Sequence, residues 1–257
     1  MARRPFEVVI SKKPDPLTTL GRDILTKHTA DGAASPISAA AATELEDLLD
    51  EAEAQVTAQG LLDKKKEELN EDRNLLLGLH DTQTSITEGT ATFYLTSIRD
   101  FLLGKFRGSE RKLGTYGFTV NSPKGEPQVI IPRNADKLTK LVGKVLEKHT
   151  EDGAGSILSV FDMAALATLN TAAAQKLTAG AKANRDKETA TQNRNLALGI
   201  SKGQTSRTPR TVLFHVCSIR DTLLGIYRGR EQSLGDWGYT VNFNSTPPPP
   251  PPPPPGD

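Results

Sequence analysis

Two histidine–aspartate pairs are the first residues in this sequence whose spacing suggests chemistry. His28 lies three residues before Asp31 in KHTADGAAS, and His149 lies three residues before Asp152 in KHTEDGAGS. A histidine and a carboxylate at one helix end supply two metal ligands, but no second histidine or cysteine at helical spacing completes a tetrahedral or facial set. We therefore expect no metal and no cofactor. The preferred interpretation is a histidine stabilised at a helix C-terminus by the helix dipole.

A second polar cluster recurs in the sequence. The segments DRNLLLG and NRNLALG share Arg73-Asn74 and Arg194-Asn195, and each is followed by a QTS triplet, Gln83–Ser85 or Gln204–Ser206. Turn and capping chemistry explains such residues. A ligand pocket between helices is the alternative, and it makes a small-ligand-binding or metal-binding bundle the second functional hypothesis.

No catalytic motif is present. The sequence contains no phosphate-binding glycine loop, nucleophile elbow or paired-acid arrangement. Its single cysteine, Cys217, excludes an internal disulfide framework and a cysteine-rich metal knuckle. We interpret Cys217 as a small packed residue. The sequence therefore predicts a protein that is not an enzyme.

The chain repeats itself. Shifting it by 121 residues aligns Leu17–Asn121 with Leu138–Asn242 without a gap, and 46 of these 105 positions are identical. This repetition predicts two homologous domains, residues 1–122 and 123–243, followed by a tail at 244–257. The positions that match His80, His215 and Cys217 in the other repeat hold serine, tyrosine and threonine. That mismatch argues against a catalytic histidine.

The repeats differ in charge. Leu17–Asn121 holds 11 basic and 17 acidic residues, a formal charge of −6, whereas Leu138–Asn242 holds 14 and 9, a charge of +5. Drift of solvated surfaces accounts for this difference. The alternative is electrostatic complementarity, within one chain or head-to-tail between chains, where head-to-tail contacts produce rings or filaments.

Helical patterns dominate each repeat. We expect a helix from Leu17 to about Ala30 that ends at Asp31-Gly32, and a new start with Ser35 as N-cap before Pro36. The stretch that follows, to about Gly78, is best divided into two helices near Gln59-Gly60, although one long helix also fits the pattern.

The last helix of each repeat is amphipathic. We expect it to start after Thr87 and Thr208 and to end at Gly108 and Gly229. Its predicted core stripe is Ala91, Leu95, Ile98, Leu102 and Phe106 in the first repeat, and Val212, Val216, Ile219, Leu223 and Tyr227 in the second. The chain is thus predicted to be all-α. We expect two antiparallel bundles of three or four helices, each with a short β-ribbon in which YGFTVN pairs with VVI or VII.

The last helix also carries polar and glycine residues opposite its core stripe. These residues are identical in both repeats: Phe93, Ser97, Asp100 and Gly104, matched by Phe214, Ser218, Asp221 and Gly225. We call them the candidate interaction face. Close packing against a neighbouring helix is one explanation, and docking of the sister domain or another protein is the other. Arg99 and Arg220 lie at the edge of the stripe, where we expect a salt bridge with a carboxylate.

The tail contains nine consecutive prolines, Pro247–Pro255, which we expect to form a polyproline II rod. Such a rod would serve as a spacer or as a ligand for an aromatic groove, with Pro247, Pro251 and Pro255 as contact positions. The N-terminal segment does not resemble a secretory signal, and the longest apolar runs are too short to span a membrane. We expect a cytoplasmic protein with no membrane partner. The net charge of +1 also disfavours nucleic-acid binding.

These observations favour a non-catalytic structural or protein-interaction module. We expect it to self-associate through complementary repeats or through the candidate interaction face, with a polyproline-binding protein as a further partner.

Overall fold

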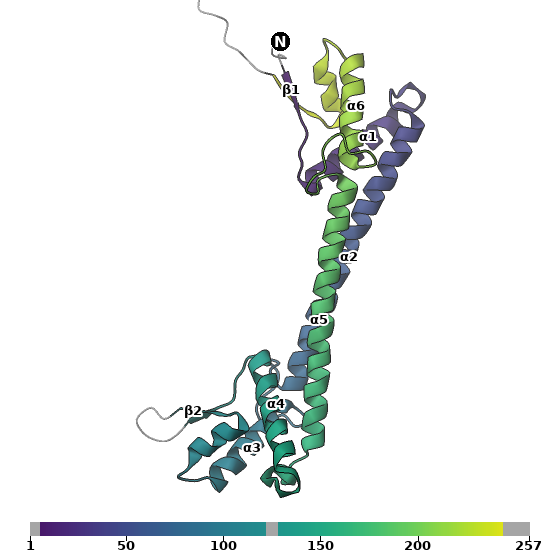
Figure 1. Cartoon of the computed structure of the whole chain (residues 1–257). Helices are drawn as coiled ribbons and strands as arrows, with labels where there is room; N and C mark the ends of the chain where they lie inside the picture. The colour runs from purple at the N-terminus through teal and green to yellow at the C-terminus, as the bar shows by residue number, and fades with distance from the viewer. Residues whose placement is uncertain (1–5, 122–127, 244–257) are drawn as a thin grey trace, which may run out of the picture. The chain divides into compact units, whose positions relative to one another are not determined.

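The structure is a computed structural model that describes residues 6–121 and 128–243. Long helices dominate it, with a few short strands (Figure 1). Contacts divide the chain into two compact units. We call Met1–Gln59 with Glu188–Asp257 the terminal unit, and Gly60–Lys187 the central unit. These boundaries differ from the predicted division near residue 122. Each unit combines the first half of one sequence repeat with the second half of the other.

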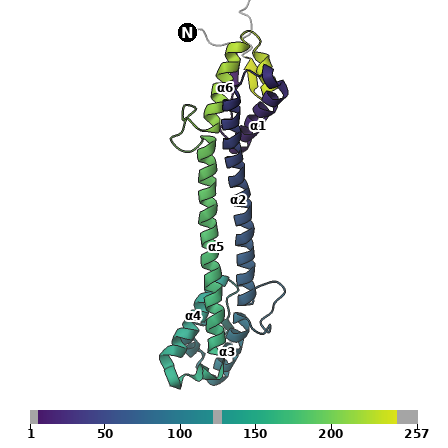
Figure 2. The same ribbon diagram turned by 90° about the vertical axis from the view of Figure 1, so that its right-hand side faces the viewer.

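The terminal unit contains both ends of the described chain. It takes the beginning of α2 and the end of α5, two helices whose residues belong to both units. Figure 2 shows α1 and α6 side by side in this unit. Its elements are β1 (Phe6–Val9), α1 (Pro14–Asp31), the 3-10 helix η1 (Gly32–Ala34), part of α2 (Ala39–Leu77), part of α5 (Met163–Leu198), α6 (Val212–Ile226), η5 (Glu231–Trp237) and β4 (Thr240–Phe243).

The central unit contains a similar set of elements, but each element comes from the opposite sequence repeat. Here the second half of the first repeat, which supplies α3, packs against α4 from the second repeat. Its elements are the end of α2, α3 (Ala91–Lys105), η2 (Glu110–Tyr116), β2 (Thr119–Asn121), β3 (Gln128–Ile130), α4 (Ala135–Asp152), η3 (Gly153–Gly155), η4 (Ile157–Val160) and the beginning of α5.

Each unit carries one two-stranded antiparallel ribbon. Its strands are the predicted segments, but the predicted pairing within one repeat is wrong, because each ribbon pairs segments of different repeats. β1 pairs with β4, with Val8 opposite Val241, and β2 pairs with β3, with Val120 opposite Val129. These four valines pack against the cores of their units. A two-stranded ribbon is marginal alone, so this packing stabilises it. Each ribbon joins a strand that precedes one repeat to the last strand of the other.

Four of the five residues in each predicted core stripe are buried, and the last one, Phe106 or Tyr227, is half-buried. In the central unit Ala91, Leu95, Ile98 and Leu102 are inaccessible to solvent, and they share a core with Leu138 and other residues of α4 and α5. The terminal unit buries the matching residues of α6 among side chains from the first repeat, a group that includes Leu17, Ile24, Leu45 and Leu49. Helical periodicity therefore identified the buried positions.

The preferred division of the middle segment into two helices is wrong. Residues Ala39–Leu77 form one helix, α2, and Met163–Leu198 form another, α5. Gly60 and Gly180 lie inside these helices. A glycine costs a helix interior only about 1 kcal/mol relative to alanine, and the surrounding residues are strong helix formers without proline. The glycine signal was therefore too weak to end either helix.

Two predicted helix starts are also wrong. Ser35 does not cap α2, because its hydroxyl bonds to His28 and to the backbone N–H of Ile37, and Ser38 instead accepts from the N–H of Ala41. The last helices start at Ala91 and Val212. Their N-caps are Thr90 and Thr211. The hydroxyl of each accepts a hydrogen bond from the backbone N–H three residues later, that of Phe93 or Phe214. The loop before each cap contains its own threonine turn, and this turn resembles a cap in the sequence.

In the central unit, α2 and α5 run antiparallel and are joined by ion pairs. Lys187 lies 2.6 Å from a carboxylate oxygen of Asp63, and Lys176 lies 2.6 Å from one of Asp72. In both pairs the acid belongs to the first, acidic repeat and the base to the second, basic one. Such exposed pairs each contribute little stability, but they favour pairing α2 with α5 over pairing either helix with a copy of itself.

One arginine in each unit, buried in the case of Arg73 and half-buried in the case of Arg194, pairs with an aspartate of the other repeat. Arg73 donates to Asp136 at 2.6 Å in the central unit, and Arg194 donates to Asp15 at 2.5 Å in the terminal unit. Asp15 and Asp136 are 121 residues apart, as are the two arginines. The same contact is thus made twice, and each time it joins two different repeats.

A double-mutant cycle is expected to show coupling between Arg73 and Asp136, which lie in the same unit but belong to different repeats. The Arg73 side chain is 9% exposed and that of Asp136 is 63% exposed, so we expect less than the full value of a buried pair. Arg73→Met with Asp136→Asn should show a coupling free energy of about 0.5–2 kcal/mol in denaturant unfolding. Arg73→Met with Asp15→Asn is the matched control and should show no coupling. Equal couplings in both cycles would contradict the observed division into units.

Candidate interaction face

The candidate interaction face lies on α3 and α6 and is largely open to solvent. Asp100 and Gly104 are exposed, as are Ser218, Asp221 and Gly225. Phe93 and Phe214 are half-buried at the first turn of their helices. Each contacts the ring of the next residue edge-on, Tyr94 at 5.6 Å and His215 at 5.4 Å between centroids. Both phenylalanines thus keep part of their surface accessible to solvent.

The two glycines of this face contact no other element. A Cβ atom added to Gly104 or to Gly225 would have no atom within 4 Å beyond its own helix. Close packing of a neighbouring helix, the first explanation for these glycines, is therefore absent from the described part of the chain. The face is identical in both repeats. Its aspartate and glycine are exposed in both units, whereas Phe93, Ser97 and Phe214 are half-buried.

The charges beside the glycines form local pairs. The Arg99 guanidinium lies 2.7 Å from Asp100, and that of Arg220 lies 2.8 Å from Asp221. The predicted salt bridge of each arginine is therefore made with the next residue along the chain. Both carboxylates stay more than half exposed. Each face thus presents an adjacent positive and negative group to solvent.

The histidines considered as metal ligands take part in turn structure. The Nδ1 atom of His28 lies 2.6 Å from the Ser35 hydroxyl, and that of His149 lies 2.8 Å from the Ser156 hydroxyl. The neighbouring aspartates, Asp31 and Asp152, form ion pairs with lysines of their own helices. Hydrogen bonds to these carboxylates raise the pKa of both lysines. Among residues 6–121 and 128–243, no three side chains of metal-binding type form a cluster.

The polar cluster that recurs in both repeats has two structural roles, since its arginines form ion pairs and its glutamines close turns. Arg73 and Arg194 form the ion pairs with the other repeat described above. Gln83 and Gln204 donate to the carbonyl oxygens of Leu75 and Leu196 and so close the turn after each long helix. Capping chemistry therefore accounts for most of this cluster.

An open polar cavity of about 510 Å³ lies beside this turn in the central unit. Arg99 and Arg133 contribute positive charge, and the buried hydroxyl oxygen of Thr96 has no hydrogen-bond partner in the described structure. One wall of the cavity consists of Ile131, Pro132 and Arg133. The sequence did not predict this wall, because these residues lie in the other predicted domain. The cavity is compatible with a polar ligand, but half of its lining differs in the terminal unit.

Cys217 lacks the environment of a reactive thiol. It is buried, and the loss of solvation raises the pKa of the thiol. A nucleophilic cysteine requires a lowered pKa and access to solvent. The prediction that Cys217 is a packed residue agrees with this burial.

The proline tail and the question of a membrane-spanning helix are the remaining features of the sequence. The proline positions Pro247, Pro251 and Pro255 lie outside the described residues. Across the helices that are described, none combines the length and apolar character needed to cross a bilayer. Comparison with known proteins adds no assignment, since no family model, no curated protein and no solved structure matches this chain.

Proposed function

We propose that the protein is a non-catalytic interaction module that associates with further copies of itself through the candidate interaction face. One observation carries the proposal: the same set of aromatic, charged and glycine residues occurs twice, and its aspartate and glycine are exposed on both α3 and α6. A duplicated face gives one chain two equivalent binding sites. Bivalency strengthens assembly without any new type of contact.

A second copy of the chain suits this face because the face is self-complementary. In a twofold contact between two identical faces, the arginine of one copy lies near the aspartate of the other, since Arg99 and Asp100 are adjacent. The glycine allows helix backbones to approach closely. The aromatic ring at the first turn supplies the buried anchor that protein interfaces require.

Light scattering of the full chain tests this proposal. At low salt and high concentration we expect a mass above the 27.7 kDa of the monomer, decreasing as salt screens the charged contacts. Gly104→Gln with Gly225→Gln should keep the protein monomeric. The fold should survive, because both positions are open and glutamine is a better helix former than glycine.

Gly60→Gln is the matched control for these variants. Gly60 is also a helical, exposed glycine with no atom near an added Cβ, but it lies in α2, a helix that carries neither face. This variant should associate like the unmodified chain. A protein that stays strictly monomeric at low salt, or a face variant that associates as strongly as the control, would overturn the proposal.

A further inference from the structure

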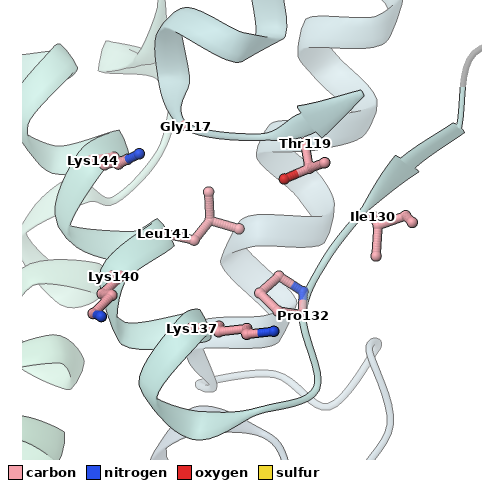
Figure 3. A pocket seen from close by; sticks show the side chains of 8 residues that line it. All are labelled: Gly117, Thr119, Ile130, Pro132, Lys137, Lys140, Leu141 and Lys144. Atoms are coloured by element: carbon pink, nitrogen blue, oxygen red, sulfur yellow. The ribbon is translucent and has the colours of Figure 1, made fainter. Parts of the chain in front are cut away.

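The central unit contains a second cavity, of about 350 Å³, between α4 and the β2–β3 ribbon (Figure 3). Its apolar part consists of Leu141 on α4 with Ile130 and Pro132 on the strand side. The Ile130 side chain is 47% exposed. The cavity therefore offers uncovered apolar surface.

Three lysines of α4 lie beside this apolar surface. Lys137, Lys140 and Lys144 line the cavity at helical spacings of three and four residues, which place them along one side of the helix. No ion pair joins any of them to a carboxylate in residues 6–121 and 128–243. In Figure 3, Leu141 lies between Lys137 and Lys144. The cavity thus combines an apolar floor with unneutralised positive charge.

Gly117 positions one of these lysines. A Cβ atom at Gly117 would lie 2.7 Å from both Cβ and Cδ of Lys144, so only glycine lets the aliphatic part of Lys144 lie against this turn. Gly117 also adopts a φ of 87°, a left-handed conformation that favours glycine. The stem of Lys144 is therefore held at the edge of the cavity, which reduces the conformational entropy that binding would cost.

The equivalent place in the terminal unit lacks this charge. The apolar residue is kept as Leu20, but proline, threonine and Asp23 replace the three lysines. Helix packing alone would not require lysines here, because α1 packs in the same way without them. The positive charge is therefore particular to the central unit.

We propose that this cavity binds a small amphipathic anion, with its apolar part on Leu141, Ile130 and Pro132 and its carboxylate or phosphate group among the lysine ammonium groups. Ligand sites typically combine a mostly apolar lining with a few convergent polar groups, and this cavity has that composition. The inference is independent of the interaction face, which lies on other helices.

Amide chemical shifts of the full chain, followed during titration, test the inference. Octanoate and octyl phosphate should each shift the amides of Thr119, Leu141 and Lys144 in a saturable way, and the tighter of the two identifies the preferred anionic group. Octanol should bind at least tenfold more weakly. Inorganic phosphate alone should produce no saturable shift at these positions.

Two variants use residues that the chain already accepts in its other unit. Lys140→Thr with Lys144→Asp copies Thr19 and Asp23, and it should weaken octanoate binding at least tenfold while the remaining spectrum shows an intact fold. Lys202→Asp is the matched control. Lys202 is an exposed lysine whose equivalent is Asp81, and its replacement should leave the affinity within twofold.

Three results would overturn the inference. The first is octanol binding as tightly as octanoate, which would make the charge irrelevant. The second is octanoate affinity in the lysine variant within twofold of the unmodified chain. The third is the absence of any saturable shift with octanoate or octyl phosphate.

Discussion

Leu45→Ala is expected to perturb Trp237, a residue of the other repeat, and to lower the stability of the terminal unit by about 2–5 kcal/mol. Leu45 is inaccessible to solvent and belongs to the same core as Trp237, the only tryptophan of the chain. Removing three buried carbon atoms leaves a cavity in that core. Denaturant unfolding followed by Trp237 fluorescence should show the loss, and the indole N–H resonance should shift.

Leu166→Ala is the matched control for this prediction. Leu166 is the equivalent of Leu45, is equally buried, and belongs to the same sequence repeat as Trp237. In the structure, however, it packs in the central unit with residues such as Leu77 and Tyr116. Leu166→Ala should therefore leave the indole resonance in place, although it costs the central unit a similar free energy. The opposite pattern, with Leu166→Ala shifting the indole, would indicate that each repeat folds on itself.

Sequence periodicity was sufficient to identify buried positions but not their partners. The stripe from Ala91 to Leu102 is buried as predicted, and so is its counterpart on α6. Leu45 and Leu166, however, are the same residue type in the same local pattern, and they belong to the cores of different units. A core built from α1 and α3 would satisfy that pattern as well as one built from α1 and α6. Only the continuity of α2 and α5 and contacts distant in sequence distinguish the two arrangements.

The site residues were predicted unevenly for a similar reason. The candidate interaction face was recognised because its four residues lie on one helix and recur after 121 positions. The cavity beside Leu141 was not recognised, although Lys137, Lys140 and Lys144 have visible helical spacing. The opposite wall of the cavity includes Gly117 and Thr119. These residues lie in the first predicted domain, whereas the three lysines lie in the second. Surfaces on a single helix can be read from sequence, whereas cavities between repeats cannot.

Cutting the chain between its two repeats is expected to leave it assembled. A protease site placed within residues 122–127 separates the first repeat from the second after cleavage. Because each unit takes its core from both repeats, the two fragments would have to expose both cores in order to separate. Unfolding of the cleaved protein should instead become dependent on protein concentration, as for any complex of two chains.

Light scattering after this cleavage, at high salt so that the interaction faces are screened, tests the exchanged arrangement most directly. We predict one species with the 27.7 kDa mass of the intact chain, which separates into two fragments only in denaturant. Two separate species under native conditions, each with a mass below that of the intact chain, would show that each repeat is its own domain, and would contradict the account.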